Sequence, residues 1–125
     1  MSDTSRVYPV TVDVWTDAAG AVQFSCNPDP LDVGKGHCEV LIVFTLNGTG
    51  FSFAQTDAIV LADKSKADFP YPSWTINATT AALFDRNKKV DRVKYIVNVV
   101  DAEGAPHSYD PEIRNGGDGT TCCDD

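Results

Sequence analysis

The chain has 125 residues and a mass of 13.5 kDa, which is the size of one domain with a single hydrophobic core. Hydrophobic residues make up 42% of it and charged residues 22%, proportions typical of a globular protein and not of a disordered one. The net charge of −8 opposes binding to nucleic acid or anionic lipid, and no apolar run is long enough to span a membrane. We therefore expect neither nucleic acid nor a membrane as a partner.

The first elements form a predicted hairpin. Apolar and polar residues alternate in Val10–Trp15 and again in Val22–Cys26, which is the period of a half-buried strand. Asp17–Gly20 has the composition of a turn and joins the two strands. Pro9 has no backbone N–H to donate, so we expect the first strand to begin at a sheet edge.

A long loop and a central strand follow. Asn27–His37 is rich in proline, glycine and acidic residues and is predicted to be a loop. Glu39–Leu46 is an apolar run dense in β-branched residues, which favours a strand buried on both faces. Asn47–Gly50 begins with Asn-Gly, the strongest short hairpin signal, so Phe51–Phe53 is predicted to return beside that strand. Ile59–Ala62 is a further short strand.

The second half of the chain contains the longest predicted strand. Asp63–Ser73 is a second long loop, and Trp74–Asn77 resumes the strand pattern. Residues 79–85 suit a helical turn and a strand equally well. Val90–Val100 alternates over its whole length, and Ala105–Ile113 is predicted to return antiparallel to it.

Seven or eight short strands with hardly a helix predict an all-β fold, a two-sheet antiparallel sandwich. An immunoglobulin-like arrangement is the first choice, and a jelly roll or a small barrel is the alternative. From Arg114 onward the only anchors are thiols, so we expect one domain over residues 1–115 and a flexible tail over 116–125. The residues expected to be almost fully buried are Val12, Val14, Leu41, Val43, Val97 and Val99.

The cysteines bear on the cellular compartment. Met1–Arg6 has no apolar segment behind a basic start, so we expect no secretory signal and a cytoplasmic protein with reduced thiols. Cys26 and Cys38 flank one loop, and the sequence leaves open whether they pair. Cys122 and Cys123 have no apolar neighbours and are expected to be exposed and reactive.

No metal or cofactor is expected. Cys26, His37 and Cys38 lack ligand spacing, and adjacent strand residues point to opposite faces. The loop carboxylates lack the spacing of an EF-hand and are interpreted as solvating charge. These carboxylates are Asp29, Asp32, Asp101, Glu103, Asp110 and Glu112.

The sequence carries no catalytic signature, and we expect a protein that is not an enzyme. It has no Gly-x-Ser-x-Gly motif and only two histidines, and Gly34–Gly36 precedes a strand instead of the helix of a phosphate-binding loop. The candidate ligand-binding residues are the aromatic Phe69, Tyr71 and Trp74, in and after a proline-rich loop. Exposed aromatic rings offer a platform for sugars or peptides, and Tyr71, between two prolines, is predicted to be the most exposed.

The end of the chain resembles a known family. Tyr95–Gly104 followed by Tyr109–Asn115, with its Asp-Pro-Glu-Ile sequence, resembles the end of the DP-EP family of small uncharacterised bacterial proteins. It is also similar to the last hairpin of inclusion-body proteins of the AidA/PixA type. The resemblance implies a bacterial origin and a β-sandwich, and it supplies no catalytic motif.

Two functions remain open. The first is a non-enzymatic module that binds a partner or self-associates as a homodimer or a small ring. Pairing would use the edge of Val10–Trp15, which only Asp13 guards. The alternative is a lectin-like binder of a small ligand such as a sugar, with or without a divalent ion.

Overall fold

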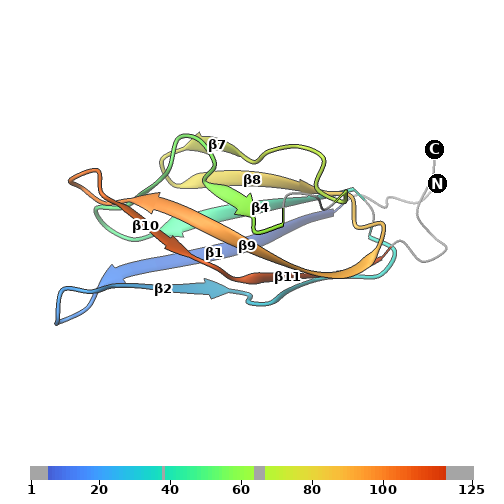
Figure 1. Ribbon diagram of the computed structural model, residues 1–125, viewed down its shortest axis with the longest axis horizontal. Coiled ribbons are helices and arrows are strands. Elements are labelled where there is room, and N and C mark those ends of the chain that lie inside the picture. Colours follow the sequence, from blue (N-terminus) through green and yellow to red (C-terminus); the bar gives the residue numbers. More distant parts are fainter. Residues whose placement is uncertain (1–5, 38, 64–66, 118–125) are drawn as a thin grey trace.

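A computed structural model of the chain describes residues 6–37, 39–63 and 67–117, and within them all regular structure is β-strand (Figure 1). The strands are β1 (Arg6–Thr16), β2 (Val22–Asn27), β3 (Leu31–Val33), β4 (Val40–Asn47), β5 (Ser52–Phe53), β6 (Ile59–Leu61), β7 (Trp74–Asn77), β8 (Thr80–Asp85), β9 (Val90–Val100), β10 (Pro106–Tyr109) and β11 (Glu112–Gly116).

The strands form two sheets that pack face to face, so the predicted all-β sandwich is confirmed (Figure 1). The first sheet has the order β2-β1-β4-β8-β7. The second has the order β10-β9-β11-β3, with β5 and β6 also paired to β9. The pairs β1–β4 and β3–β11 are parallel and the others antiparallel, so the sheets are mixed and not wholly antiparallel.

The predicted hairpin of β1 and β2 is confirmed. The two strands pair from Thr11–Asn27 to Thr16–Val22. The Asp17 carboxylate accepts hydrogen bonds from the amides of Ala19 and Ala21, each at 2.9 Å, and this closes the turn.

The edge predicted for β1 is only partly correct. From Arg6 to Val10, β1 pairs with β4 alone among the described strands, and Pro9, which lacks a donor, lies in this part. From Thr11 onward β2 covers the other side. The prediction that Val10–Trp15 is an open edge is therefore wrong, because β4 pairs with it across a long sequence separation that local patterns do not reveal.

The Asn47-Gly48 hairpin is also a wrong prediction. β5 pairs with β9 in the second sheet, so the chain crosses between sheets after β4. At Gly48 a Cβ atom would lie 2.5 Å from the carbonyl oxygen of Val14, so the crossing needs a glycine. The strand that returns beside β4 is β8, which settles residues 79–85 as a strand.

The long strand β9 and its return are as predicted. β10 and β11 both pair antiparallel to β9 in the same register, and the strand is interrupted between them at Asp110-Pro111. β11 continues to Gly116, and the amide of Gly117 donates to Asn87 Oδ1 at 3.0 Å, so ordered chain runs past the expected boundary at residue 115. Residues 118–125 and Cys38 lie outside the described residues, and so do the predictions on Cys122 and Cys123.

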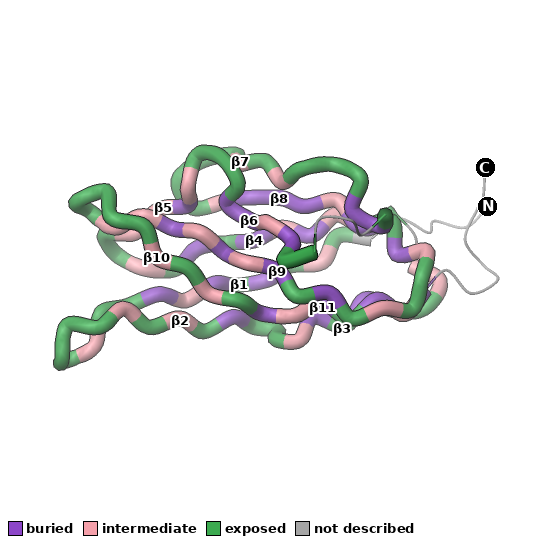
Figure 2. Tube along the Cα trace, in the orientation of Figure 1, coloured by how far each residue is buried: buried purple, intermediate pink, exposed green. Residues whose placement is uncertain are grey.

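Burial alternates along the strands (Figure 2). Val12, Val14, Val97 and Val99 are buried as predicted, at 2% exposure or less. Leu41 and Val43 are only half-buried, which corrects the expectation for β4. The inward residues of this strand are Val40, Ile42, Phe44 and Leu46, because the second sheet covers only one face of the first.

We expect alanine substitutions in β4 to have different effects on the two faces of the strand. Ile42→Ala should lower the free energy of unfolding by about 2–5 kcal/mol, because it leaves a cavity in the core. Leu41→Ala, one residue away on the opposite face, should lower it by less than about 1.5 kcal/mol. Urea unfolding of dilute protein measures both values, and equal losses would contradict the alternation.

Candidate functional site

The structure does not bring the three predicted aromatic residues together. Phe69 is 7% exposed and turns toward the interior, whereas Tyr71 and Trp74 are 60% and 45% exposed. The Tyr71 ring packs on Phe84 of β8, with ring centroids 5.7 Å apart. The prediction that Tyr71 is the most exposed of the three is confirmed, and Phe69 is the one of the three that is buried.

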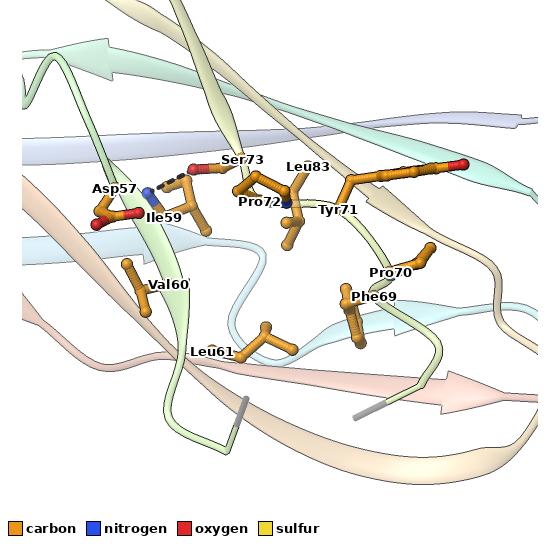
Figure 3. A pocket seen from close by; sticks show the side chains of 10 residues that line it. All are labelled: Asp57, Ile59, Val60, Leu61, Phe69, Pro70, Tyr71, Pro72, Ser73 and Leu83. Carbon is orange, nitrogen blue, oxygen red and sulfur yellow. Dashed lines mark hydrogen bonds between the residues drawn. The ribbon is translucent and has the colours of Figure 1, made fainter. Parts of the chain in front are cut away.

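Phe69 borders a cavity of about 270 Å³ between β6 and the loop that precedes β7 (Figure 3). Ile59, Leu61 and Leu83 contribute apolar walls, while the carboxylate of Asp57 and the hydroxyl of Ser73 lie toward one end (Figure 3). Ser73 Oγ already accepts a hydrogen bond from the amide of Ile59 at 3.2 Å. The described residues that line the cavity include neither histidine nor cysteine, and the apolar walls with two polar groups offer a place for a small ligand.

A second candidate surface is the outward face of the first sheet. Two rows of side chains cross the sheet there, because the strand registers align them. Within each row, every strand residue lies opposite the next. The first row is Val7, Leu41 and Phe84, and the ring of Tyr71 packs on Phe84 and so extends this row. The second row is Pro9, Val43, Ala82 and Trp74. We call these eight residues the outer face; all of them are exposed or half-buried except Ala82, which is fully buried.

The outer face is apolar and carries no charge. Val7 is 66% exposed and Trp74 45% exposed, although both are large hydrophobic residues. The next row consists of threonines, and the nearest charge beyond it in β1 is Asp13, which accepts a hydrogen bond from Asn47 at 2.8 Å. Contiguous apolar surface of this kind marks interaction sites on soluble proteins.

The thiol of Cys26 is unsuited to catalysis. Its side chain is 7% exposed and belongs to the hydrophobic core, as a free cysteine. Burial, with smaller contributions from the carboxylates of Asp29 and Asp13, raises the pKa of Cys26 to about 12. The reactive thiolate is therefore strongly disfavoured.

The histidines and loop carboxylates are engaged in local contacts. The His37 ring contacts the hydroxyl of Tyr8, and His107 Nε2 lies 2.9 Å from Asp101 Oδ2. That hydrogen bond is the main cause of a lowered pKa of Asp101, which also accepts from the amides of Glu103 and Ala105. Within residues 6–37, 39–63 and 67–117, no three potential metal ligands of the His, Cys, Asp and Glu types lie together.

A buried polar cluster that no sequence motif indicated lies at one end of the sandwich. It comprises Asp68, Asp85, Asn87 and Asn115, all less than 10% exposed. Burial is the largest cause that raises the pKa of Asp85, to about 7, against hydrogen bonds from Asn115 and Asn87 that lower it. An acidic or amide residue at the end of an apolar strand is the only local signal of such a cluster.

Comparison with known proteins adds no assignment. The chain matches no model of a protein family and no curated protein. In the described part of the chain, no helix is long and apolar enough to cross a membrane.

We expect the Cys26 thiol to resist alkylation in the folded protein. Its burial and raised pKa leave almost no accessible thiolate at about pH 8. Iodoacetamide labelling followed by peptide mass mapping should find Cys26 labelled only after denaturation. The Cys26→Ala variant identifies the peptide, and rapid labelling of native protein would contradict the structure.

Proposed function

We propose that the chain is a non-enzymatic bacterial binding module that self-associates through the outer face. The observation that carries this proposal is the pair of uncharged apolar rows across the first sheet. Exposed valine, tyrosine and tryptophan side chains there have apolar area that an association would remove from water.

A second copy of the chain is the occupant that this surface suits. A two-fold contact places the same uncharged rows against each other, and sheets pack in this way at about 10 Å. Because the rows contain no carboxylate, the net charge of −8 acts only from the periphery, where salt screens it beyond about 8 Å. A face-to-face contact closes with two copies, so it favours a homodimer over a ring.

We expect Val7→Asp to shift the protein to a monomer. It places a charge within the first apolar row, where dimerisation would bury it without a partner. Val90→Asp is the matched control, because Val90 is 81% exposed but belongs to β9 of the second sheet. Both variants have the same net charge, and both original side chains are exposed, so neither should unfold the protein.

Light scattering over a concentration series at physiological salt measures the association. The wild-type chain and Val90→Asp should both approach the mass of two chains, and Val7→Asp should keep the mass of one. A wild-type mass of one chain throughout would exclude self-association and leave a different protein as the occupant of this face.

The second candidate is a lectin-like binder of a small ligand such as a sugar. The cavity beside Phe69 favours it, because aromatic and apolar walls combine there with the carboxylate of Asp57 and the hydroxyl of Ser73. Trp74 does not line this cavity, so the proposed ligand set is Phe69 and Tyr71 without it.

We expect any sugar binding to depend on Asp57. Asp57→Asn removes the charge and retains a residue that tolerates the φ of 56° at this position. A thermal-shift screen of monosaccharides, with and without calcium, should find a stabilising sugar whose effect disappears in Asp57→Asn and persists in Val7→Asp. No shift with any sugar would rule out this candidate.

A further inference from the structure

The buried polar cluster joins segments that are far apart in the sequence. Asn87 Nδ2 donates to the carbonyls of Gly34 and His37, at 2.9 and 2.8 Å, and so connects the β8–β9 turn with the loop before β4. Asn87 Oδ1 accepts from the amide of Gly117 at the end of β11. Asn87 therefore has every polar group of its side chain in use.

The two carboxylates of the cluster have different partners. Asp68 Oδ2 accepts from the amides of Lys88 and Lys89 and from Asn115 Nδ2, at 3.0, 3.1 and 3.2 Å. Three N–H groups therefore converge on one oxygen of Asp68. Asp85 Oδ1 accepts from the amide of Asn87 and from Asn115 Nδ2, both at 2.9 Å.

Two oxygen atoms of the cluster have no hydrogen-bond donor within the described part of the chain. They are Asp85 Oδ2 and Asn115 Oδ1, and both are fully buried. An unsatisfied buried acceptor destabilises the folded state, and a buried charge without a cationic partner destabilises it further. Among the described residues, both hydrogen bonds to Asp85 come from amide groups, and none comes from a lysine, arginine or histidine side chain.

One proton on the Asp85 carboxyl group would supply the donor that these two oxygen atoms lack. A protonated carboxyl has an O–H donor, whereas the ionised form only accepts. We infer that Asp85 is a neutral carboxylic acid in the folded protein, which donates from Oδ2 to Asn115 Oδ1. Because Asn115 Nδ2 already donates to Asp85 Oδ1, the two side chains then form a reciprocal acid–amide pair. The proton comes from solvent, and its loss leaves Asp85 Oδ2 and Asn115 Oδ1 as two buried acceptors without a donor among the described residues.

The charged surroundings of Asp85 favour the neutral form. The carboxylate of Asp68, in the segment before β7, repels a negative charge on Asp85 and so contributes to the raised pKa of Asp85. From the β8–β9 turn, Lys88 and Lys89 present backbone amides to Asp68. Other titratable groups on the elements around the cluster include Tyr8 and Asp13 on β1, Lys35, His37 and Glu39 before β4, Arg86 after β8, Asp91, Arg92, Lys94 and Tyr95 on β9, and Glu112 and Arg114 on β11.

The acid–amide pair makes the stability of the fold at this end of the sandwich depend on pH. The pKa of Asp85 is about 7 in the folded chain against 3.8 for an ordinary aspartate, so the folded state holds a proton that the unfolded state releases. The contribution of Asp85 to the free energy of unfolding is fully present below about pH 4 and is lost as pH rises toward about 7. This inference does not depend on the proposed function.

We expect Asp85→Asn to remove this pH dependence, because asparagine keeps the shape and both the donor and the acceptor of the neutral acid. In the wild type the unfolding constant should rise about tenfold per pH unit between about pH 5 and pH 6.5, and in Asp85→Asn it should stay flat. Asp68→Asn is the matched control, since it removes an ionised acceptor of three N–H groups and should weaken the fold at every pH.

Urea unfolding across this pH range measures these constants, and each variant is also made with His37→Gln because histidines change charge in the same range. The carbon resonance of the Asp85 carboxyl group in ¹³C NMR reports its protonation directly. A resonance of the ionised form at about pH 5, or an Asp85→Asn protein less stable than the wild type at that pH, would overturn the inference. Strong stabilisation of the wild type by Mg²⁺ or Ca²⁺ at about pH 5.5, where the inference has Asp85 neutral, would overturn it too, because a cation would then satisfy the two oxygens.

Discussion

The parallel pairing of β1 with β4 is the contact on which the two faces of the first sheet depend. In its register, Val10 lies opposite Phe44 and Val12 opposite Leu46 on the inward face. The same register places Val7 opposite Leu41 on the outward face. Because side chains alternate along a strand, one pairing creates both the core and the outer face, and a shift of one residue would exchange them.

The two faces meet different physical demands. The inward residues of β4 are completely covered, since the second sheet lies over them at sandwich spacing (Figure 2). The outward residues Leu41 and Val43 are also apolar but only half-buried, although an antiparallel or mixed sheet with a solvated face usually carries polar residues there. Only the end of the strand follows that rule, with Thr45 and Asn47 exposed. In the described part of the chain no further layer of strands covers this face, so its apolar side chains remain in contact with solvent.

The polar cluster holds the opposite kind of chemistry. Asp68, Asp85 and Asn115 are as buried as many core residues, yet their side chains are held by hydrogen bonds and not by apolar packing. Such a network specifies one arrangement of the segments it joins, because a displaced partner leaves another polar group unsatisfied. The proton inferred on Asp85 makes the stability of that arrangement depend on pH.

The sequence by itself determined the strand class, the first hairpin and the return of the chain along β9, because these depend on two-residue alternation and short turns. It placed Tyr71 outside correctly, since prolines flank it. Only the tertiary structure decided that β1 lies within its sheet, that β5 crosses to β9, and that Leu41 faces outward. Such features depend on competition between strands far apart in the chain, and an unbroken apolar run such as β4 gives no local sign of which face is covered. The same holds for Asp85 and Asn115, which are 30 residues apart and meet only in the folded protein.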